Sequence, residues 1–283
     1  MKKQFFLFGI ISLIALLSCN NDDNRISEDS NVIREKYLVD KIEFYQTSSN
    51  NKLTEYIYDS ENRLKQRITT GKMVENGNVR DLRYEHDFKY ENNLVSKIRI
   101  KDLTHYELSH DIHLFYDTQS KLIRQETWMN GVMIEHSNFH YENNRMVSIY
   151  DDTTEPFEYN TIFYDAKGNV TKHLYIVPKT DLMGYPIPGE FQEIENNYEY
   201  DNSLKPNFGI DGLFAYEALP GIGGDTNFAR WLSNNNLSKY INSGTTWDFT
   251  YNEFGLPESF EMKWKDTETT YPMVWNISYK EVE

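Results

Sequence analysis

The chain has 283 residues, with 29 basic and 44 acidic side chains, and its formal net charge is −15. So acidic a composition argues against binding of nucleic acid, because contacts with phosphates need basic patches. It also argues against a protein surface that lies directly on anionic lipids.

The first eighteen residues have the organisation of an export signal. Two lysines precede an apolar run from Phe5 to Leu17, which is shorter than the roughly 20 residues of a membrane-spanning helix. The run ends in the sequence LLSC, which resembles a bacterial lipobox and implies cleavage before Cys19 and lipidation of that residue. Several acyl chains on one residue give stable anchoring, so Cys19 is predicted to tether the protein to a membrane. An ordinary secretion signal is the alternative.

Residues 19–36 are predicted to form a disordered acidic tether, because they contain many charged and few apolar side chains. The sequence NNDD at positions 20–23 resembles the acidic tag of Bacteroidetes-type lipoproteins, which helps to send them to the cell surface. We therefore expect an outer-membrane lipoprotein that is displayed on the surface. A location on the periplasmic face is the alternative.

A short pattern recurs seven times after residue 37. Each copy has a tyrosine, then an acid or asparagine, a polar turn and an aliphatic residue. Before each tyrosine, apolar and polar side chains alternate, which is typical of a strand. After it come residues that tolerate positive φ, such as Asn92 and Gly168, and these predict a tight turn in which the acid accepts backbone N–H groups. The copies begin at Tyr58, Tyr90, Tyr116, Tyr141, Tyr164, Tyr200 and Tyr251.

Seven hairpins in sequence order predict about fourteen antiparallel strands with one apolar face. A flat sheet of that width would be unusual, because twist makes wide sheets curl, split or close. We expect an all-β fold in a single domain over residues 37–283: a long, curved antiparallel meander that is half-wrapped or barrel-like. The tyrosine rings should lie near the rim of the sheet, with their hydroxyls reaching a turn or water.

Residues 205–243 interrupt the repeat with prolines and glycines and lack the period of two. We expect an irregular, partly helical lobe there, with one or two helical turns at 228–232, that plugs or caps the open side of the sheet. Long loops inside compact domains are often functional. The candidate ligand-binding residues are therefore aromatic: Phe208, Tyr216 and Trp231 in the lobe, together with Tyr185.

Several of these motifs resemble known families. The sequence YDAKGNV at 164–170 is similar to the YD repeats of Rhs and teneurin shells. A closer resemblance is to uncharacterised Bacteroidetes lipoproteins built from degenerate hairpins, which share an Asn/Pro segment and an LSxNNL box. Here these read KPNF at 205–208 and LSNNNL at 232–237. The resemblance covers most of residues 37–283. It implies an all-β exported lipoprotein and supplies no known activity.

The sequence predicts no metal site and no cofactor. His136 and His140 share one face of a predicted strand, but side chains four residues apart on a strand lie about 13 Å apart and cannot bind one ion together. The glycine cluster at 221–224 lacks the strand-to-helix context of a nucleotide site, and no GxSxG, HExxH or phosphate-loop motif occurs.

These observations favour a non-catalytic, lipid-anchored envelope protein that binds a glycan or a protein and acts as a monomer. A structural envelope lipoprotein without a specific ligand is one alternative. A carbohydrate-active hydrolase is the other, and it would require two carboxylates facing one pocket under the 205–243 lobe.

Overall fold

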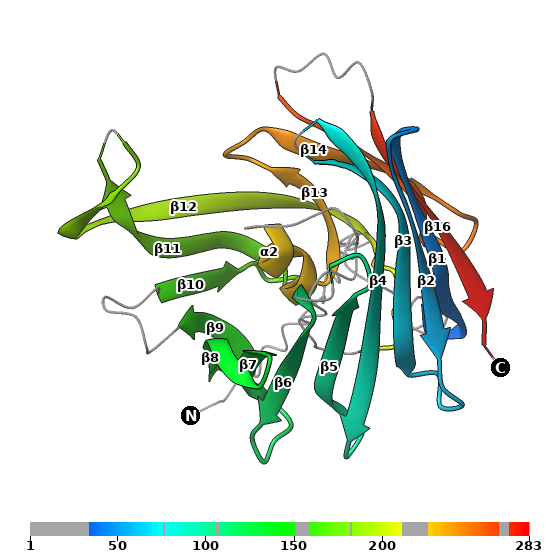
Figure 1. Cartoon of the computed structure of the whole chain (residues 1–283), viewed down its shortest axis with the longest axis horizontal. Helices are drawn as coiled ribbons and strands as arrows, with labels where there is room; N and C mark the ends of the chain where they lie inside the picture. The colour runs from blue at the N-terminus through cyan, green and yellow to red at the C-terminus, as the bar shows by residue number, and fades with distance from the viewer. Residues whose placement is uncertain are drawn as a thin grey trace, which may run out of the picture.

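The computed structural model describes residues 34–75, 77–105, 108–150, 159–181, 183–210, 226–265 and 272–282. Within these ranges sixteen strands, each antiparallel to both neighbours, form one closed barrel in sequence order (Figure 1). The first half consists of β1 Tyr37–Thr47, β2 Asn50–Tyr58, β3 Leu64–Glu75, β4 Asn78–Glu91, β5 Leu94–Asp102, β6 His110–Tyr116, β7 Leu122–Met129 and β8 Val132–Glu142. The second half consists of β9 Arg145–Tyr150, β10 Tyr159–Tyr164, β11 Val170–Thr180, β12 Pro186–Leu204, helix α2 Thr226–Leu232, β13 Asn235–Tyr240, β14 Thr245–Tyr251, β15 Pro257–Lys263 and β16 Met273–Glu281.

The barrel closes between β1 and β16, the first and the last strand. Phe44 lies opposite Trp275 in this pair, and the Val282 amide donates a 2.8 Å hydrogen bond to the Lys36 carbonyl just beyond it. The predicted all-β antiparallel order is confirmed, whereas the half-wrapped alternative is wrong. Seven hairpins supply β2 to β15, and the two flanking strands pair with each other. Closure thereby satisfies backbone groups that an open edge would leave unpaired.

The turns of the repeat have the predicted chemistry. Asp117 Oδ1 accepts the backbone N–H groups of Gln119 at 2.8 Å and Lys121 at 2.9 Å. Asn252 takes the same role in its own copy, where the acid is replaced. Positive φ values occur where the sequence predicted them, at Asn92, Asn93, Asn130, Gly131, Asn143, Asn144 and Gly168. The polar residue after the tyrosine therefore holds the turn in the copies that carry Asp or Asn there, whereas the Asn92–Asn93 and Asn143–Asn144 turns, which follow Glu91 and Glu142, reverse the chain through two residues with positive φ.

The repeat tyrosines gather at one end of the barrel, because each ends an even-numbered strand and these strands all run the same way. We call this end the tyrosine rim. Their rings pack against the core, as predicted, but most of the recorded hydroxyl bonds reach the start of the preceding strand and not their own turn. The donor and acceptor pairs are Tyr58 to Val39, Tyr90 to Leu64, Tyr116 to Val95, Tyr164 to Met146 and Tyr279 to Pro257. Each such bond crosses from one hairpin to the strand before it.

The two faces of the barrel differ sharply in polarity. Inward side chains form a single apolar cluster that includes Ile42, Ile112 and Trp275, and the Trp275 ring stacks on Phe260 at 4.7 Å. Outward side chains of the same strands are mostly charged or polar, as alternation along a strand requires. Lys41 and Glu55, for example, form an ion pair on the outside of β1 and β2. The apolar core of this fold is therefore inside the barrel.

Helix α2 lies within the ring of strands and packs on β11 and β13 (Figure 1). The predicted helical turns at 228–232 fall within it. The expected lobe is, however, shorter than 205–243, because Asn235–Tyr240 is strand β13 of the barrel wall. Leu237 faces inward opposite Tyr200. The sequence 235–240 is polar and lacks clear alternation, so packing of Leu237 in the core, and not local pattern, determines that this segment is a strand.

Candidate functional site

The chain turns into the barrel after β12. Pro206 cannot donate to a strand ladder, and the next residue bonds to β1 instead. The Asn207 carbonyl accepts the Val39 amide at 2.9 Å, and the Asn207 side chain donates to the Arg34 carbonyl at 3.1 Å. These bonds hold the segment 205–210 across the inside of the tyrosine rim, where Phe208 is buried.

The LSNNNL box holds the other end of the insertion. Asn169, in the β10–β11 turn, accepts the amides of Asn234 at 3.0 Å and Asn235 at 2.9 Å. Ser233 accepts the amide of Val170 at 2.8 Å, and Asn236 donates to the Leu204 carbonyl at 2.9 Å. The box therefore ties α2 and the start of β13 to neighbouring strands, and these side chains serve the fold.

Lys205 reaches the carboxyl-terminal end of α2. Its ammonium donates to the carbonyls of Ser233 at 2.8 Å and Trp231 at 3.3 Å, and also to the carbonyl of Arg230. A helix C-terminus favours a cation, because its last carbonyls have no partner within the helix. Burial, with smaller effects of the nearby Arg34 and Arg230 charges, nevertheless lowers the pKa of Lys205 to about 7.

Arg230 points into the barrel from α2, and only 8% of its surface is exposed. Its guanidinium lies over the Trp247 ring, 4.3 Å from the ring centre, which is a favourable cation–π distance. Burial lowers the pKa of Arg230 to about 9, so the group is still charged at neutral pH. Its Nε and Nη2 atoms have no hydrogen-bond partner among the described residues.

These two cations line a cavity of about 40 Å³ inside the barrel. Its walls come from the insertion and from four strands, and they are largely aromatic or aliphatic. The apolar lining residues are Pro206, Phe208, Trp231, Leu237, Phe249, Phe260 and Ile277, and the amides of Asn235 and Asn236 complete it. The site thus combines the positive charge of Arg230, and that of Lys205 when it is protonated, with apolar walls.

The structure brings together two of the four predicted ligand-binding residues. Phe208 and Trp231 are neighbours in the cavity wall, with ring centres 6.2 Å apart. Tyr185 lies instead at the tip of the β11–β12 hairpin, at the rim opposite the tyrosine rim, and is 67% exposed. Tyr216 lies outside the described residues, as does Cys19.

Lys205 and Arg230 are the residues that sequence reasoning missed. In the sequence each looks like an ordinary surface charge, Lys205 before a proline and Arg230 before an aromatic residue. The available signal was a basic residue inside an otherwise apolar stretch, as in the sequence FARWL. None of the described lining residues is Asp or Glu, so this cavity lacks the carboxylate pair that a glycosidase requires.

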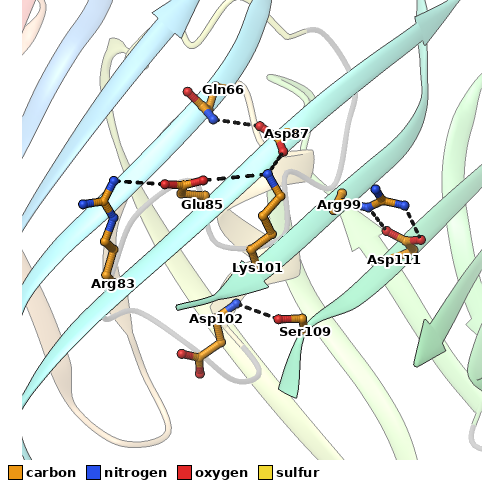
Figure 2. A network of polar contacts seen from close by, with 9 residues as sticks. All are labelled: Gln66, Arg83, Glu85, Asp87, Arg99, Lys101, Asp102, Ser109 and Asp111. Atoms are coloured by element: carbon orange, nitrogen blue, oxygen red, sulfur yellow. Dashed lines mark hydrogen bonds and ion pairs between the residues drawn. The ribbon is translucent and has the colours of Figure 1, made fainter. Parts of the chain in front are cut away.

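The outside of β3 to β6 carries a lattice of ion pairs (Figure 2). Lys101 contacts Asp87 at 2.6 Å, and Asp111 accepts from Arg99 at 2.9 Å and from Lys97 at 2.6 Å. Partial burial would raise the pKa of Asp111, but the hydrogen bonds from Arg99 and Lys97 outweigh it and lower the pKa to about 2. This lattice covers the outward face of the wall with paired charges.

Among the described residues, no group of three or more His, Cys, Asp or Glu side chains is placed to hold a metal ion. Over the same ranges, no helix is both long and apolar enough to cross a membrane.

The fold is similar to that of solved barrels. A porin-like protein from Bacteroides uniformis superposes with a TM-score of 0.55 at 14% identity, covering 86% of this chain and 98% of that protein. A porin-like protein from Bacteroides vulgatus gives a TM-score of 0.40 at 13% identity, over 87% of this chain and 99% of that one. At these identities the first likeness shows a shared barrel fold.

No protein-family model and no curated protein matches the sequence. The resemblance to YD repeats therefore has no support from these comparisons. What the structure retains of that resemblance is the hairpin unit itself, with a tyrosine, a turn-holding acid and a returning strand.

Proposed function

We propose that the chain is a non-catalytic envelope protein, anchored by lipid on Cys19, whose water-exposed barrel binds a glycan or protein ligand and does not conduct solutes. The polarity of the barrel wall carries this proposal. Barrels that span a membrane face lipid with an apolar band and have a polar interior. Here the outward faces of β3 to β6 carry the ion pairs of Figure 2. The inward faces carry part of the apolar core, together with buried Arg67, Thr69 and His86.

A charged lattice at bilayer depth would be costly, because outward Arg or Lys at the midplane destabilises membrane barrels by about 2–4 kcal/mol each. The likeness to the porin-like protein from Bacteroides uniformis thus supports the barrel architecture, whereas the surface chemistry of this chain supports a barrel that stands in water.

Planar-bilayer recording tests the first half of the proposal. The purified full-length protein should give no conductance steps under conditions in which a bacterial porin does. Reproducible steps from the wild-type protein would refute the water-exposed barrel. The variant Asp111→Asn provides a check, because any steps that arise from contaminants should be the same in both preparations.

Membrane fractionation tests the anchor. Wild-type protein should stay with the outer-membrane fraction and gain mass from acyl chains, whereas Cys19→Ser should lose the added mass and leave the membrane. An unmodified Cys19 in the mature protein would rule out the lipoprotein assignment.

Ligand binding is the remaining half. Glycan arrays and cross-linking in intact cells should identify a ligand. Added purified protein should compete with the cell-bound protein for that ligand. Blank results in both, combined with loss of envelope integrity on deletion, would favour the structural lipoprotein instead.

A further inference from the structure

Three basic side chains lie near one another at the inside of the tyrosine rim, in a protein whose net charge is −15. Arg34, Lys205 and Arg230 are close enough that the first and third disfavour the charged form of the second. A buried charge is normally paired, because removal from water is costly without a partner. Lys205 and Arg230 line the cavity, and its described lining residues include no carboxylate to balance these two charges.

The two buried cations differ in how they are satisfied. Lys205 has three protons and three carbonyl acceptors at the end of α2, so its hydrogen bonds are complete. Arg230 has the Trp247 ring beneath it but no acceptor for Nε or Nη2 among the described residues. A buried polar group without a partner calls for an explanation. Here the unsatisfied atoms belong to a residue that lines a cavity.

The unpaired atoms also have a specific shape. Nε and Nη2 form one edge of the planar guanidinium, and that edge presents two parallel N–H bonds. Carboxylates accept such a pair in a bidentate arrangement, which adds both strength and geometric selectivity. A lysine at the same place would offer a point charge without this fork.

The remainder of the cavity limits what could accompany the carboxylate. Phe208, Trp231 and Phe249 offer only apolar walls. About 10–15 Å³ of such volume holds one water molecule, so a cavity of about 40 Å³ suits a small molecule and excludes an oligosaccharide. The walls favour an aliphatic or aromatic body over a sugar.

We propose that the interior cavity is a binding site for a small apolar monocarboxylate, with the Nε–Nη2 edge of Arg230 holding the carboxylate and Phe208 and Trp231 packing on its body. This ligand is distinct from the glycan or protein ligand proposed above, and neither proposal depends on the other.

Thermal unfolding of the full-length protein tests the assignment with sodium butyrate and sodium benzoate as probes. Sodium chloride and sodium phosphate at equal ionic strength serve as references. Ligands that bind only the folded state raise its melting temperature in proportion to the logarithm of their concentration. Both carboxylates should therefore raise Tm above the chloride reference. No rise beyond chloride overturns the proposal, and a rise with phosphate alone overturns the carboxylate assignment.

The variant Arg230→Met distinguishes a ligand-binding role of Arg230 from a purely structural role. Replacing an unpaired buried charge by an apolar side chain removes its desolvation cost, so this variant should melt higher than wild type in chloride and gain nothing from butyrate. An equal carboxylate response in Arg230→Met would refute the role of the guanidinium.

Arg230→Lys keeps the charge and loses the fork. By isothermal titration it should bind benzoate at least tenfold more weakly than wild type, and it supplies the comparison if the methionine variant does not fold. Arg63→Met, in the β2–β3 turn beside Asp59, is the control and should bind as wild type does. Unchanged affinity in Arg230→Lys would overturn the bidentate contact.

Discussion

The Tyr90 hydroxyl donates a 2.8 Å hydrogen bond to the Leu64 carbonyl, at the start of the strand before its own. The same relation recurs around the tyrosine rim and links neighbouring hairpins in addition to their strand ladders. Burial, with the nearby Asp59 charge, raises the pKa of Tyr90 to about 12. The hydroxyl therefore remains a donor through the physiological range.

Tyr90→Phe should lower the free energy of unfolding by about 1 kcal/mol, because it removes one hydrogen bond and leaves the packed ring in place. Urea titration measures the loss. Tyr45→Phe, on the outer face of β1, is the matched control and should change stability by less than about 0.5 kcal/mol. Equal effects of the two substitutions would mean that the bond to Leu64 contributes nothing specific.

Gly168 combines a positive φ of +87° with a tight contact, because a Cβ there would lie 2.5 Å from the Asn234 side-chain nitrogen. Gly131 has a similar φ of +78° but nothing within 4 Å of its Cβ position. Gly131→Ala should therefore show only the backbone cost, about 1–2 kcal/mol. Gly168→Ala should cost more, since it also displaces Asn234 from the LSNNNL box. Similar urea midpoints of unfolding for the two variants would contradict the close contact between residue 168 and the Asn234 side chain.

The lowered pKa of Lys205 predicts a pH dependence of stability. Between its folded value of about 7 and its ordinary value of 10.5, the unfolded chain holds more protons at this group, so the free energy of unfolding rises with pH. The lowered pKa of Arg230 adds to the rise above about pH 9. Above about pH 10 the buried tyrosines act in the opposite direction, because they ionise more readily in the unfolded chain.

Chemical denaturation at a series of pH values from 7 to 9 checks this dependence. Lys205→Met should abolish most of the increase, whatever its effect on stability at neutral pH. The exposed Lys167→Met should retain the increase. A wild-type protein whose stability falls across this window would contradict the burial of the ammonium.

Asp111→Asn leaves Lys97 and Arg99 side by side on the outer wall without their shared carboxylate. The loss should be about 1 kcal/mol at low ionic strength and should shrink in high salt, because exposed charges are screened. A double-mutant cycle with Arg99→Gln would isolate the pair. Since the pKa of Asp111 is lowered to about 2, its contribution should persist above pH 4 and disappear as the pH falls towards 2.

The hairpins were predictable because their information is local. Alternation predicts the strands, and the Asn or Gly residues after the tyrosines predict the turns, all within a dozen residues. Asn92, Asn93 and Gly168 have the positive φ values that this reasoning required. Closure was not predictable in the same way. It depends on the pairing of β1 with β16. Neither strand contains a copy of the full pattern, and all the other strands lie between them in the sequence.

The site was predictable only in its apolar part. Phe208 and Trp231 stand out as aromatic residues in a stretch that lacks the repeat, whereas Tyr185 was chosen for its aromatic ring and lies on a distant hairpin tip. Lys205 and Arg230 could not be recognised, because burial of a cation depends on the barrel wall that surrounds it. Their role comes from β14, β15 and β16, which are remote from them in the sequence.

The pairing of Tyr37 with Glu281 makes barrel assembly depend on both ends of the repeat array. Contacts between such distant segments form slowly, since a long loop must close before they contribute. Until β16 docks, β1 and β15 each expose an unpaired edge that can add a strand from another chain. A holding chaperone would therefore be most needed at this last step, and loss of β16 alone should convert the protein into an aggregation-prone open sheet.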